Sequence, residues 1–173
     1  MIIVLMGYMG SGKSLIGSHL SKVIDFDYID LDDYISEKEA SSISELFENK
    51  GEIFFRKIET KYLKELLDKK SNLVISLGGG TPCYSNNLEL ILRNDTIQSF
   101  YLKASILTLT ERLISEKSKR PLLSHISSKS EIQEFIGKHL FERSQFYSQS
   151  NYTIVTDNKS VEAIIEDILF HLI

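Results

Sequence analysis

The chain has 173 residues, of which 42% are hydrophobic and 25% charged, and these values are typical of one folded domain rather than a disordered or fibrous protein. Its formal net charge of −4 excludes a general attraction to nucleic acid, so a few placed cations must bind any anionic ligand. Cys83 is the single cysteine, which excludes an internal disulfide and suits the cytoplasmic location that we expect.

The first residues are expected to form a buried strand. Residues 1–6 are a continuous apolar run that stops at Gly7, and no basic leader stands before it, so we expect no signal peptide. No run approaches the roughly 18 apolar residues that a membrane helix needs, so we expect no membrane partner. From Lys13, apolar residues recur at helical spacing as far as Ile24 and predict the first helix.

Strand and helix patterns alternate along the rest of the chain. Short apolar runs predict strands at residues 26–29, 73–77, 97–102 and 152–155. Helical spacing predicts helices at residues 44–67, with an interruption near 49–51, and at 86–93, 106–114, 132–146 and 161–173. Residues 115–129 have no clean period and contain Pro121 and several serines, which indicates a mobile loop or lid. Five strands separated by helices predict an α/β fold, a five-stranded parallel sheet flanked by helices in one domain, 1–173.

A glycine-rich loop follows the first strand. The sequence Gly7-Tyr-Met-Gly-Ser-Gly-Lys-Ser14 matches the phosphate-loop pattern, in which backbone amides converge on phosphate oxygens. Lys13 is placed to reach the β- and γ-phosphates, and the Ser14 hydroxyl to bind magnesium. An ordinary glycine turn is the alternative, but a buried strand before the loop and a helix N-terminus after it favour a bound anion. We expect the nucleotide to contact Gly10, Ser11, Gly12, Lys13, Ser14 and Leu15.

Acidic residues follow the second predicted strand. Asp30-Leu-Asp32-Asp33 stands at its carboxyl end, the edge at which parallel sheets bind their ligands. Asp30 is a candidate magnesium ligand, and Asp32 a candidate partner for a substrate hydroxyl. Alternatively, Asp32 or Asp33 caps the next helix.

Three glycines follow the third predicted strand. Gly78, Gly79 and Gly80 permit positive φ angles and a close approach of a ligand to the backbone, although a tight turn is the alternative. A few placed cations must also bind any anionic substrate. Arg56, Arg120 and Arg143 are the candidates, against the ordinary alternative of exposed surface arginines.

Taken together, these motifs resemble those of the shikimate kinase family from residue 1 to the end. The matching stretches are Gly7-Tyr-Met-Gly, Asp30-Leu-Asp32, Phe55-Arg56-Lys-Ile-Glu59, Ser76-Leu-Gly-Gly-Gly80, Arg120-Pro-Leu-Leu123, and Arg143 followed by Tyr147. The resemblance implies a three-layer P-loop kinase fold with a mobile lid at about 112–128 and a substrate-binding helical region at about 32–62. It also implies transfer of the γ-phosphate of ATP to the 3-hydroxyl of shikimate, with Mg²⁺, on the route to chorismate and the aromatic amino acids.

The same resemblance implies roles for individual residues. Asp32 would hold the reacting hydroxyl and act as its base, with Lys13 and Arg120 meeting the transferring phosphate. Arg56 and Arg143 would bind the shikimate carboxylate beside Gly78, Gly79 and Gly80, whose backbone contacts the ring hydroxyls. Arg112 would lie on the adenine side. The apolar residues Ile43, Phe47, Phe55 and Leu122 would wall the ring, or belong to the ordinary core.

Two other functions remain open from the sequence. One is a related small-molecule kinase resembling a gluconate kinase, which would not be expected to combine Phe55-Arg56 with the triple glycine. The other is a nucleotide-binding module without catalysis, which predicts damage at Lys13, Asp32, Arg56 or Arg120, and all four are intact. We expect a monomer. Cys83 is either a modifiable thiol or a small apolar filler.

Overall fold

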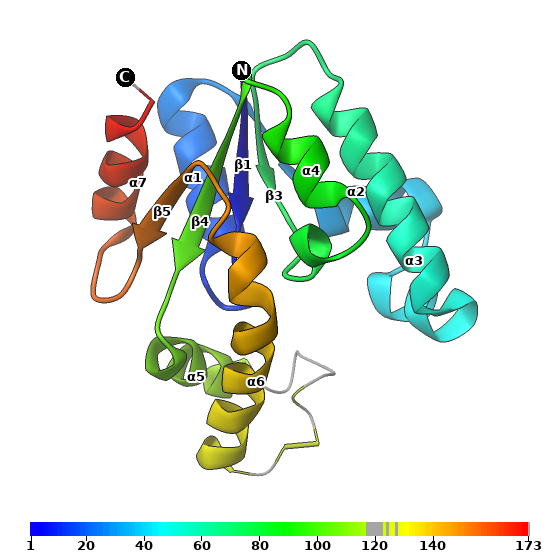
Figure 1. The fold of residues 1–173 in the computed structure, drawn as a ribbon, viewed down its shortest axis with the longest axis vertical. Helices are drawn as coiled ribbons and strands as arrows, with labels where there is room; N and C mark the ends of the chain where they lie inside the picture. The colour runs from blue at the N-terminus through cyan, green and yellow to red at the C-terminus, as the bar shows by residue number, and fades with distance from the viewer. Residues whose placement is uncertain (117–122, 124, 127, 173) are drawn as a thin grey trace.

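Five parallel strands form the centre of the computed structural model, which describes residues 1–116, 123, 125, 126 and 128–172 (Figure 1). The strands are β1 (Ile2–Met6), β2 (Asp27–Asp30), β3 (Leu73–Ser76), β4 (Ile97–Lys103) and β5 (Tyr152–Val155). They lie side by side in the order β2-β3-β1-β4-β5, with every neighbouring pair parallel. The expected five-stranded parallel sheet is therefore confirmed. All five residues of the central β1 are buried, as its continuous apolar sequence predicts.

Helices occupy the connections between the strands. They are α1 (Lys13–Ile24), α2 (Leu31–Glu39), α3 (Ile43–Leu67), α4 (Asn87–Leu92), α5 (Ile106–Ser115), α6 (Lys129–Tyr147) and α7 (Val161–Phe170), with a 3-10 turn η1 (Thr81–Cys83). The expected interruption in the long helix is found at Gly51, whose φ of 80° and ψ of 168° break the helical path of α3. The closing helix ends at Phe170, earlier than expected.

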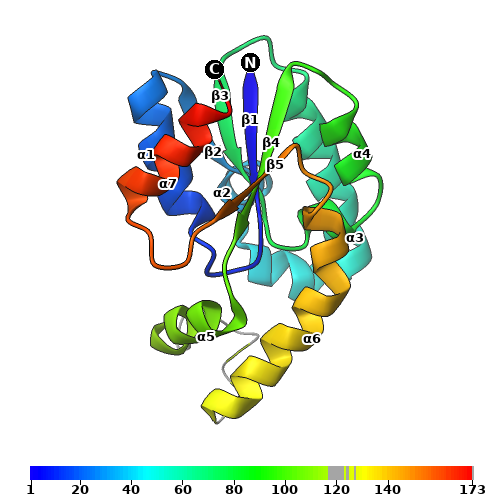
Figure 2. The same ribbon diagram turned by 60° about the vertical axis from the view of Figure 1, so that its left-hand side comes forward.

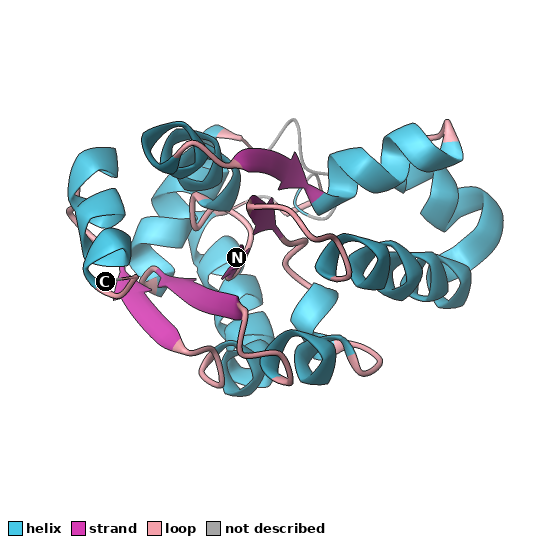
Figure 3. Ribbon diagram, turned by 90° about the horizontal axis from the view of Figure 1, so that it is seen from above, coloured by secondary structure: helices cyan, strands magenta, loops and turns pink. Residues whose placement is uncertain are grey.

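The sheet separates two apolar cores. Ile3 and Leu5 of β1 pack with α1 and α7 on one face, whereas Ile2, Val4 and Met6 pack with α2, α3, α4 and α6 on the other. Figures 2 and 3 show the strands between these two groups of helices. The alternation follows from the strand period of two, which sends successive side chains to opposite faces. The result is the expected three-layer arrangement.

The helix N-termini differ in how their first amides are satisfied. Side-chain oxygens cap five helices, with Asp30 at α2, Ser42 at α3, Ser105 at α5, Ser128 at α6 and Ser160 at α7. The N-cap of α1 is Gly12, which has no side chain to cap the first turn. Backbone amides and the positive end of the helix dipole favour an anion at such an N-terminus.

The carboxyl ends of the strands share one edge, at the lower side of the sheet in Figure 1. The loop at residues 7–12, the start of α2 and the turn at residues 78–80 all follow strands that end there. Of the proposed lid, residues 112–115 belong to the last turn of α5, and most of its remainder lies outside the described residues. Within the described part, no helix is long and apolar enough to cross a membrane.

Candidate active site

A cleft of about 700 Å³ opens at this edge of the sheet. It brings together the predicted site residues of the described part, which are Gly10, Ser11, Gly12, Lys13, Ser14, Leu15, Asp30, Asp32, Arg56, Gly78, Gly79, Gly80, Arg112 and Arg143. Arg120 and Leu122, which the sequence also proposed, lie outside the described residues. Segments far apart in the chain therefore meet at one place.

The phosphate loop forms the floor of one end of the cleft. Gly10 and Gly12 have φ angles of 80° and 95°, which side-chain-bearing residues rarely adopt, so the tight path of the loop needs glycine. The ammonium of Lys13 donates hydrogen bonds to the carbonyls of Gly7 and Tyr8 at 2.9 and 3.0 Å. Arg112 of α5 donates from Nη1 to the carbonyl of Gly10 at 3.0 Å. Two cations thus lie against the loop.

Ser14 and Asp30 are joined across the floor of the cleft. The Ser14 hydroxyl donates to Oδ2 of Asp30 at 2.7 Å, and Oδ1 of Asp30 accepts from the backbone amide of Asp32 at 3.0 Å. Asp30 is therefore the cap of α2, and the alternative that Asp32 or Asp33 caps it is wrong. The reason is positional, because β2 leads directly into α2 and the cap is the last extended residue. Asp32 is left available to the cleft.

Asp32 has an environment that disfavours its charge. Burial raises the pKa of its carboxyl to about 6, with further increases from the negative charges of Asp30 and Glu59. Lys13 acts in the opposite direction and lowers it. A carboxylate with a raised pKa in a ligand cleft is a candidate acid–base group.

The glycines at 78–80 differ from expectation in one respect. None of the three has a positive φ, so backbone freedom is not what they supply. They supply space. A β-carbon on Gly78 would lie 3.0 Å from Oδ1 of Asp32, and one on Gly80 would lie 2.9 Å from Nη2 of Arg56. At Gly79 the same atom would lie 3.7 Å from Nη1 of Arg143. Successive glycines therefore face the three candidate substrate-binding side chains.

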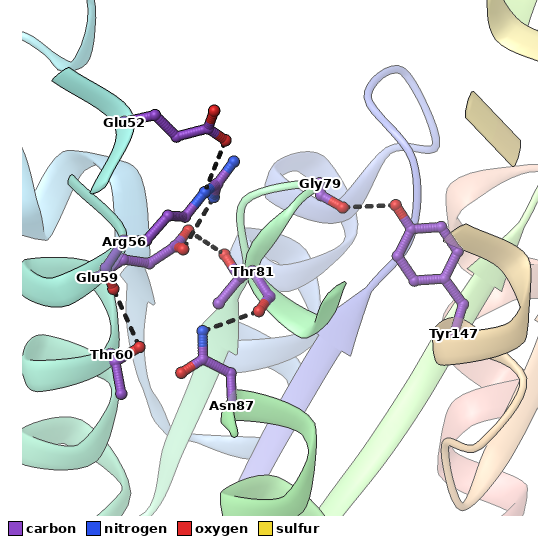
Figure 4. Close-up of polar contacts among 8 residues, drawn as sticks. All are labelled: Glu52, Arg56, Glu59, Thr60, Gly79, Thr81, Asn87 and Tyr147. Carbon is purple, nitrogen blue, oxygen red and sulfur yellow. Dashed lines mark hydrogen bonds and ion pairs between the residues drawn. The ribbon is translucent and has the colours of Figure 1, made fainter. Parts of the chain in front are cut away.

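Arg56 of α3 is fixed in place, and the surface-arginine alternative is wrong for it. Its Nη1 donates to Oε2 of Glu59 at 2.9 Å, and its Nε to Oε1 of Glu52 at 3.4 Å (Figure 4). The ring of Tyr84 lies 3.8 Å from its Cζ, a cation–π contact. Only 16% of the Arg56 side chain is exposed.

Glu59 links Arg56 to the turn formed by Gly78, Gly79 and Gly80, called the glycine turn below. Its Oε1 accepts from the Thr81 hydroxyl at 2.6 Å, and Asn87 donates to the Thr81 carbonyl at 2.9 Å (Figure 4). The side chain of Glu59 is only 1% exposed. Sequence reasoning gave Glu59 no role, although its spacing of three residues from Arg56 on one helix was a usable indication of an ion pair.

Arg143 lies one turn after His139 on α6 and, like Arg56, lines the cleft. The Tyr8 hydroxyl and Nδ1 of His139 share a hydrogen bond of 2.9 Å, and the Arg143 guanidinium lies 5.8 Å from the centre of the Tyr8 ring. Burial lowers the pKa of His139 and the charge of Arg143 lowers it further, against a smaller opposing effect of Glu142. His139 lines the cleft and was not found from the sequence.

Apolar side chains close one wall. Ile43, Phe47 and Phe55 line the cleft, with the two phenyl rings 4.5 Å apart between centroids. Cys83 is half-buried beyond the glycines, and burial raises the pKa of its thiol to about 11. A thiol that stays protonated at pH 7 is a poor nucleophile, so its environment favours the filler over the modifiable thiol.

Comparison with known proteins gives a consistent result. A family model described as shikimate kinase matches residues 9–172. A shikimate kinase of Flavobacterium johnsoniae is 49% identical over 167 residues, covering 96% of each chain. The crystal structure of a shikimate kinase from Bacteroides thetaiotaomicron matches with a TM-score of 0.90 and 34% identity, over 99% of this chain and 97% of the other. One from Acinetobacter baumannii, in complex with shikimate, matches with a TM-score of 0.88 and 28% identity, over 99% and 92%.

Proposed function

The chain belongs to the shikimate kinase family, and we propose that it transfers the γ-phosphate of ATP to the 3-hydroxyl of shikimate, giving shikimate 3-phosphate and ADP. It is an ATP-dependent kinase that acts on shikimate, on the route to chorismate and the aromatic amino acids. The observation that supports the detailed assignment best is the glycine turn, whose three residues face Asp32, Arg143 and Arg56 beside a phosphate loop.

The ATP end of the cleft is assigned to the phosphate loop. The amides at the start of α1 would bind the phosphates, and this end of the cleft is lined by Gly10, Ser11, Gly12, Ser14 and Leu15. Lys13 would move from the loop carbonyls to the transferring phosphate and stabilise its charge. We assign Arg112 to the adenine side. Arg120 is assigned to the transferring phosphate on the resemblance alone, because it lies outside the described residues.

The shikimate end is assigned to the opposite half of the cleft. Arg56 and Arg143 would bind the carboxylate from two sides, since a guanidinium offers a planar fork that fits it. The backbone at Gly78, Gly79 and Gly80 would contact the ring hydroxyls.

Asp32 would accept the hydrogen bond of the reacting hydroxyl. A pKa of about 6 places its carboxyl close to the range in which a general base is effective. In a loose transition state most of the catalysis comes from positioning, so holding the hydroxyl in line with the γ-phosphate is its first task.

The residues beside the phosphate loop fit Mg²⁺. Magnesium in kinases is bound by one or two protein oxygens together with phosphates, not by a cage of side chains. Ser14 and Asp30 provide such a pair, with their oxygens 2.7 Å apart. Among the described residues there is no larger group of candidate metal ligands. Ser14 and Asp30 would hold the ion, which would help to neutralise the charge that develops on the transferring group.

A coupled assay of ADP release tests the proposal, with magnesium-ATP and a panel of polyols and hydroxy acids that includes shikimate and gluconate. Of the acceptors in the panel, only shikimate is expected to stimulate ADP release. Gluconate as the better acceptor would favour the gluconate-kinase alternative, and no stimulation by any acceptor would favour a non-catalytic module. Arg56→Ala should raise the KM for shikimate, whereas Lys13→Ala should abolish turnover. The expected monomer is tested separately by light scattering.

A further inference from the structure

In the glycine turn the backbone carbonyls are hydrogen-bonded within the described part of the protein, whereas the backbone amides are not. The carbonyls of Gly78 and Gly80 accept backbone hydrogen bonds from the following turn at 3.1 and 2.9 Å. The carbonyl of Gly79 accepts instead from the hydroxyl of Tyr147, at 2.5 Å across 68 residues of chain. Within the described residues, the amide N–H groups of all three glycines have no protein partner. The amides are therefore the donors that remain for a ligand in the cleft.

The bond to Tyr147 fixes the direction of the next amide. The described part of the chain has no cis peptide, so the carbonyl of Gly79 and the N–H of Gly80 point in opposite directions from their shared peptide plane. Tyr147 lies on one side of Gly79, and Arg56 with Thr81 lies on the other (Figure 4). The N–H of Gly80 therefore points away from Tyr147, toward the side of the cleft on which Arg56 lies.

A peptide between two glycines needs such an anchor. Glycine has no β-carbon to restrict φ and ψ, so a peptide plane between two glycines, such as that between Gly79 and Gly80, rotates readily unless it is held. Its two flanking carbonyls are held by bonds within the turn itself, but the Gly79 carbonyl depends on a side chain from another helix.

Tyr147 is well suited to hold it. The residue is fully buried at the last position of α6, and its ring packs against Tyr101 with centroids 5.1 Å apart. Burial raises the pKa of the Tyr147 hydroxyl, so it keeps its proton and acts as a donor. It stands one helical turn after Arg143, so the same helix positions the arginine and the peptide.

We propose that Tyr147 is a positioning residue for the substrate, which orients the Gly79–Gly80 peptide so that the Gly80 N–H donates to a ring hydroxyl of shikimate. This inference deepens the proposed function and rests on it. The hydroxyl of Tyr147 touches neither substrate. It also interacts with the guanidinium of Arg143, a second route to the substrate that analogues of shikimate distinguish from the peptide.

Tyr147→Phe removes only the hydroxyl and tests the role. The KM for shikimate should rise about 5- to 10-fold, the size expected for one misaligned hydrogen bond, while the KM for ATP stays within about 2-fold. Tyr101→Phe is the matched control, because it removes a hydroxyl from the adjacent ring without touching Gly79 and should leave both constants unchanged. If the unaltered protein does not phosphorylate shikimate, the proposed function is overturned. An active protein whose Tyr147→Phe variant keeps the normal KM overturns only the positioning role.

Deoxy analogues of shikimate locate the effect. The penalty of Tyr147→Phe on binding, measured by calorimetry, should disappear for the analogue that lacks the hydroxyl bound by Gly80. The amide of shikimate lacks the carboxylate that Arg143 is proposed to bind. If the penalty persists for every deoxy analogue but disappears for this amide, the effect acts through Arg143 and the inference is overturned.

A spectrum of the unaltered protein gives a test that does not depend on the variant folding. With ¹⁵N-glycine labelling only nine glycines contribute, and Gly80→Ala assigns the signal of Gly80. Addition of shikimate should shift the Gly80 amide. An amide that does not move overturns the proposed contact.

Discussion

Arg56 and Glu59 form an ion pair of 2.9 Å in which the two partners differ in exposure. The carboxylate of Glu59 is buried, whereas the guanidinium of Arg56 lies at the cleft, and within the described residues its Nη2 has no hydrogen-bond partner. Glu59 also accepts from Thr81, so its position is set from two sides. The buried acid thus orients the arginine, and the arginine in turn keeps the buried acid paired.

Glu59→Gln should therefore weaken substrate binding through its effect on Arg56, with little change in side-chain volume. The amide keeps an oxygen for Thr81 but loses the charge that holds Arg56. We expect the KM for shikimate to rise about 10-fold and the free energy of unfolding to fall by about 1–3 kcal/mol, because part of a buried network is lost. Steady-state kinetics and urea denaturation measure the two effects.

Glu52→Gln is the control for this change. Glu52 contacts the same arginine at 3.4 Å, but 53% of its side chain is exposed. An exposed pair of this kind contributes about 0–1 kcal/mol. The KM for shikimate and the free energy of unfolding should therefore both stay close to the values of the unaltered protein. Equal effects of the two substitutions would contradict the role given to burial.

Gly80→Ala should displace Arg56 directly. The added β-carbon would lie 2.9 Å from Nη2, closer than such atoms approach, so the guanidinium must move. The backbone tolerates alanine, because φ is −90° and ψ −19°. We expect a rise of about 10-fold or more in the KM for shikimate, with the fold retained by circular dichroism.

Gly137→Ala separates this effect from a general consequence of replacing glycine. Gly137 lies inside α6, where a β-carbon would meet Ile106 at an ordinary 3.7 Å. The free energy of unfolding should rise by up to about 1 kcal/mol, because glycine is unfavourable within a helix, and the KM should not change. A normal KM in Gly80→Ala would show that Arg56 is not constrained by the turn.

These contacts show what the sequence could predict and what it could not. Strands and helices followed from apolar periodicity, since buried faces impose a period of 2 or 3.6 on the sequence. The phosphate loop was found because its glycines are consecutive in the chain. The position of Asp32 next to Gly78 was not accessible in this way, because their contact depends on β2 and β3 lying side by side.

The sequence alone could not separate two explanations that share one pattern. Asp30 stands just before α2 and Asp32 in its first turn, and only the exact end of β2 decides that Asp30 is the cap. Three adjacent glycines suggest unusual φ angles, but here they leave room for large side chains from other elements. Likewise, the bond between Tyr147 and Gly79 joins residues 68 positions apart, and no local pattern indicates it.

The double role of Asp30 can be separated by two substitutions. Asparagine caps helices about as well as aspartate but lacks the charge that binds magnesium. Asp30→Asn should therefore raise the magnesium concentration for half-maximal activity about 10-fold, with little change in the free energy of unfolding. Asp30→Ala should raise this magnesium concentration by a similar factor and also lower the free energy of unfolding by about 1 kcal/mol, because the helix cap is lost. If Asp30→Asn has the normal magnesium dependence, Asp30 is a cap alone.

Asp32 should make both activity and stability depend on pH, in opposite directions. Its folded-state pKa of about 6 lies above the ordinary 3.8, so between these values the folded protein binds more protons than the unfolded chain. The free energy of unfolding should therefore fall as the pH rises from about 4 to about 6. The carboxylate needed to hold the hydroxyl forms over the same range, so kcat/KM for shikimate should increase.

Asp32→Asn removes the titration and tests both directions at once. Without ligands at pH 8, the variant should be more stable than the unaltered protein by up to about 3 kcal/mol, since one pKa unit corresponds to about 1.4 kcal/mol. At pH 4 the two should unfold alike, and the variant should have little activity at any pH. Asp33→Asn, at an exposed position on the same turn, should change stability much less. Urea denaturation at pH 4 and pH 8 measures these free energies of unfolding. If Asp32→Asn is no more stable than the unaltered protein at pH 8, the charge of Asp32 is already compensated in the folded state.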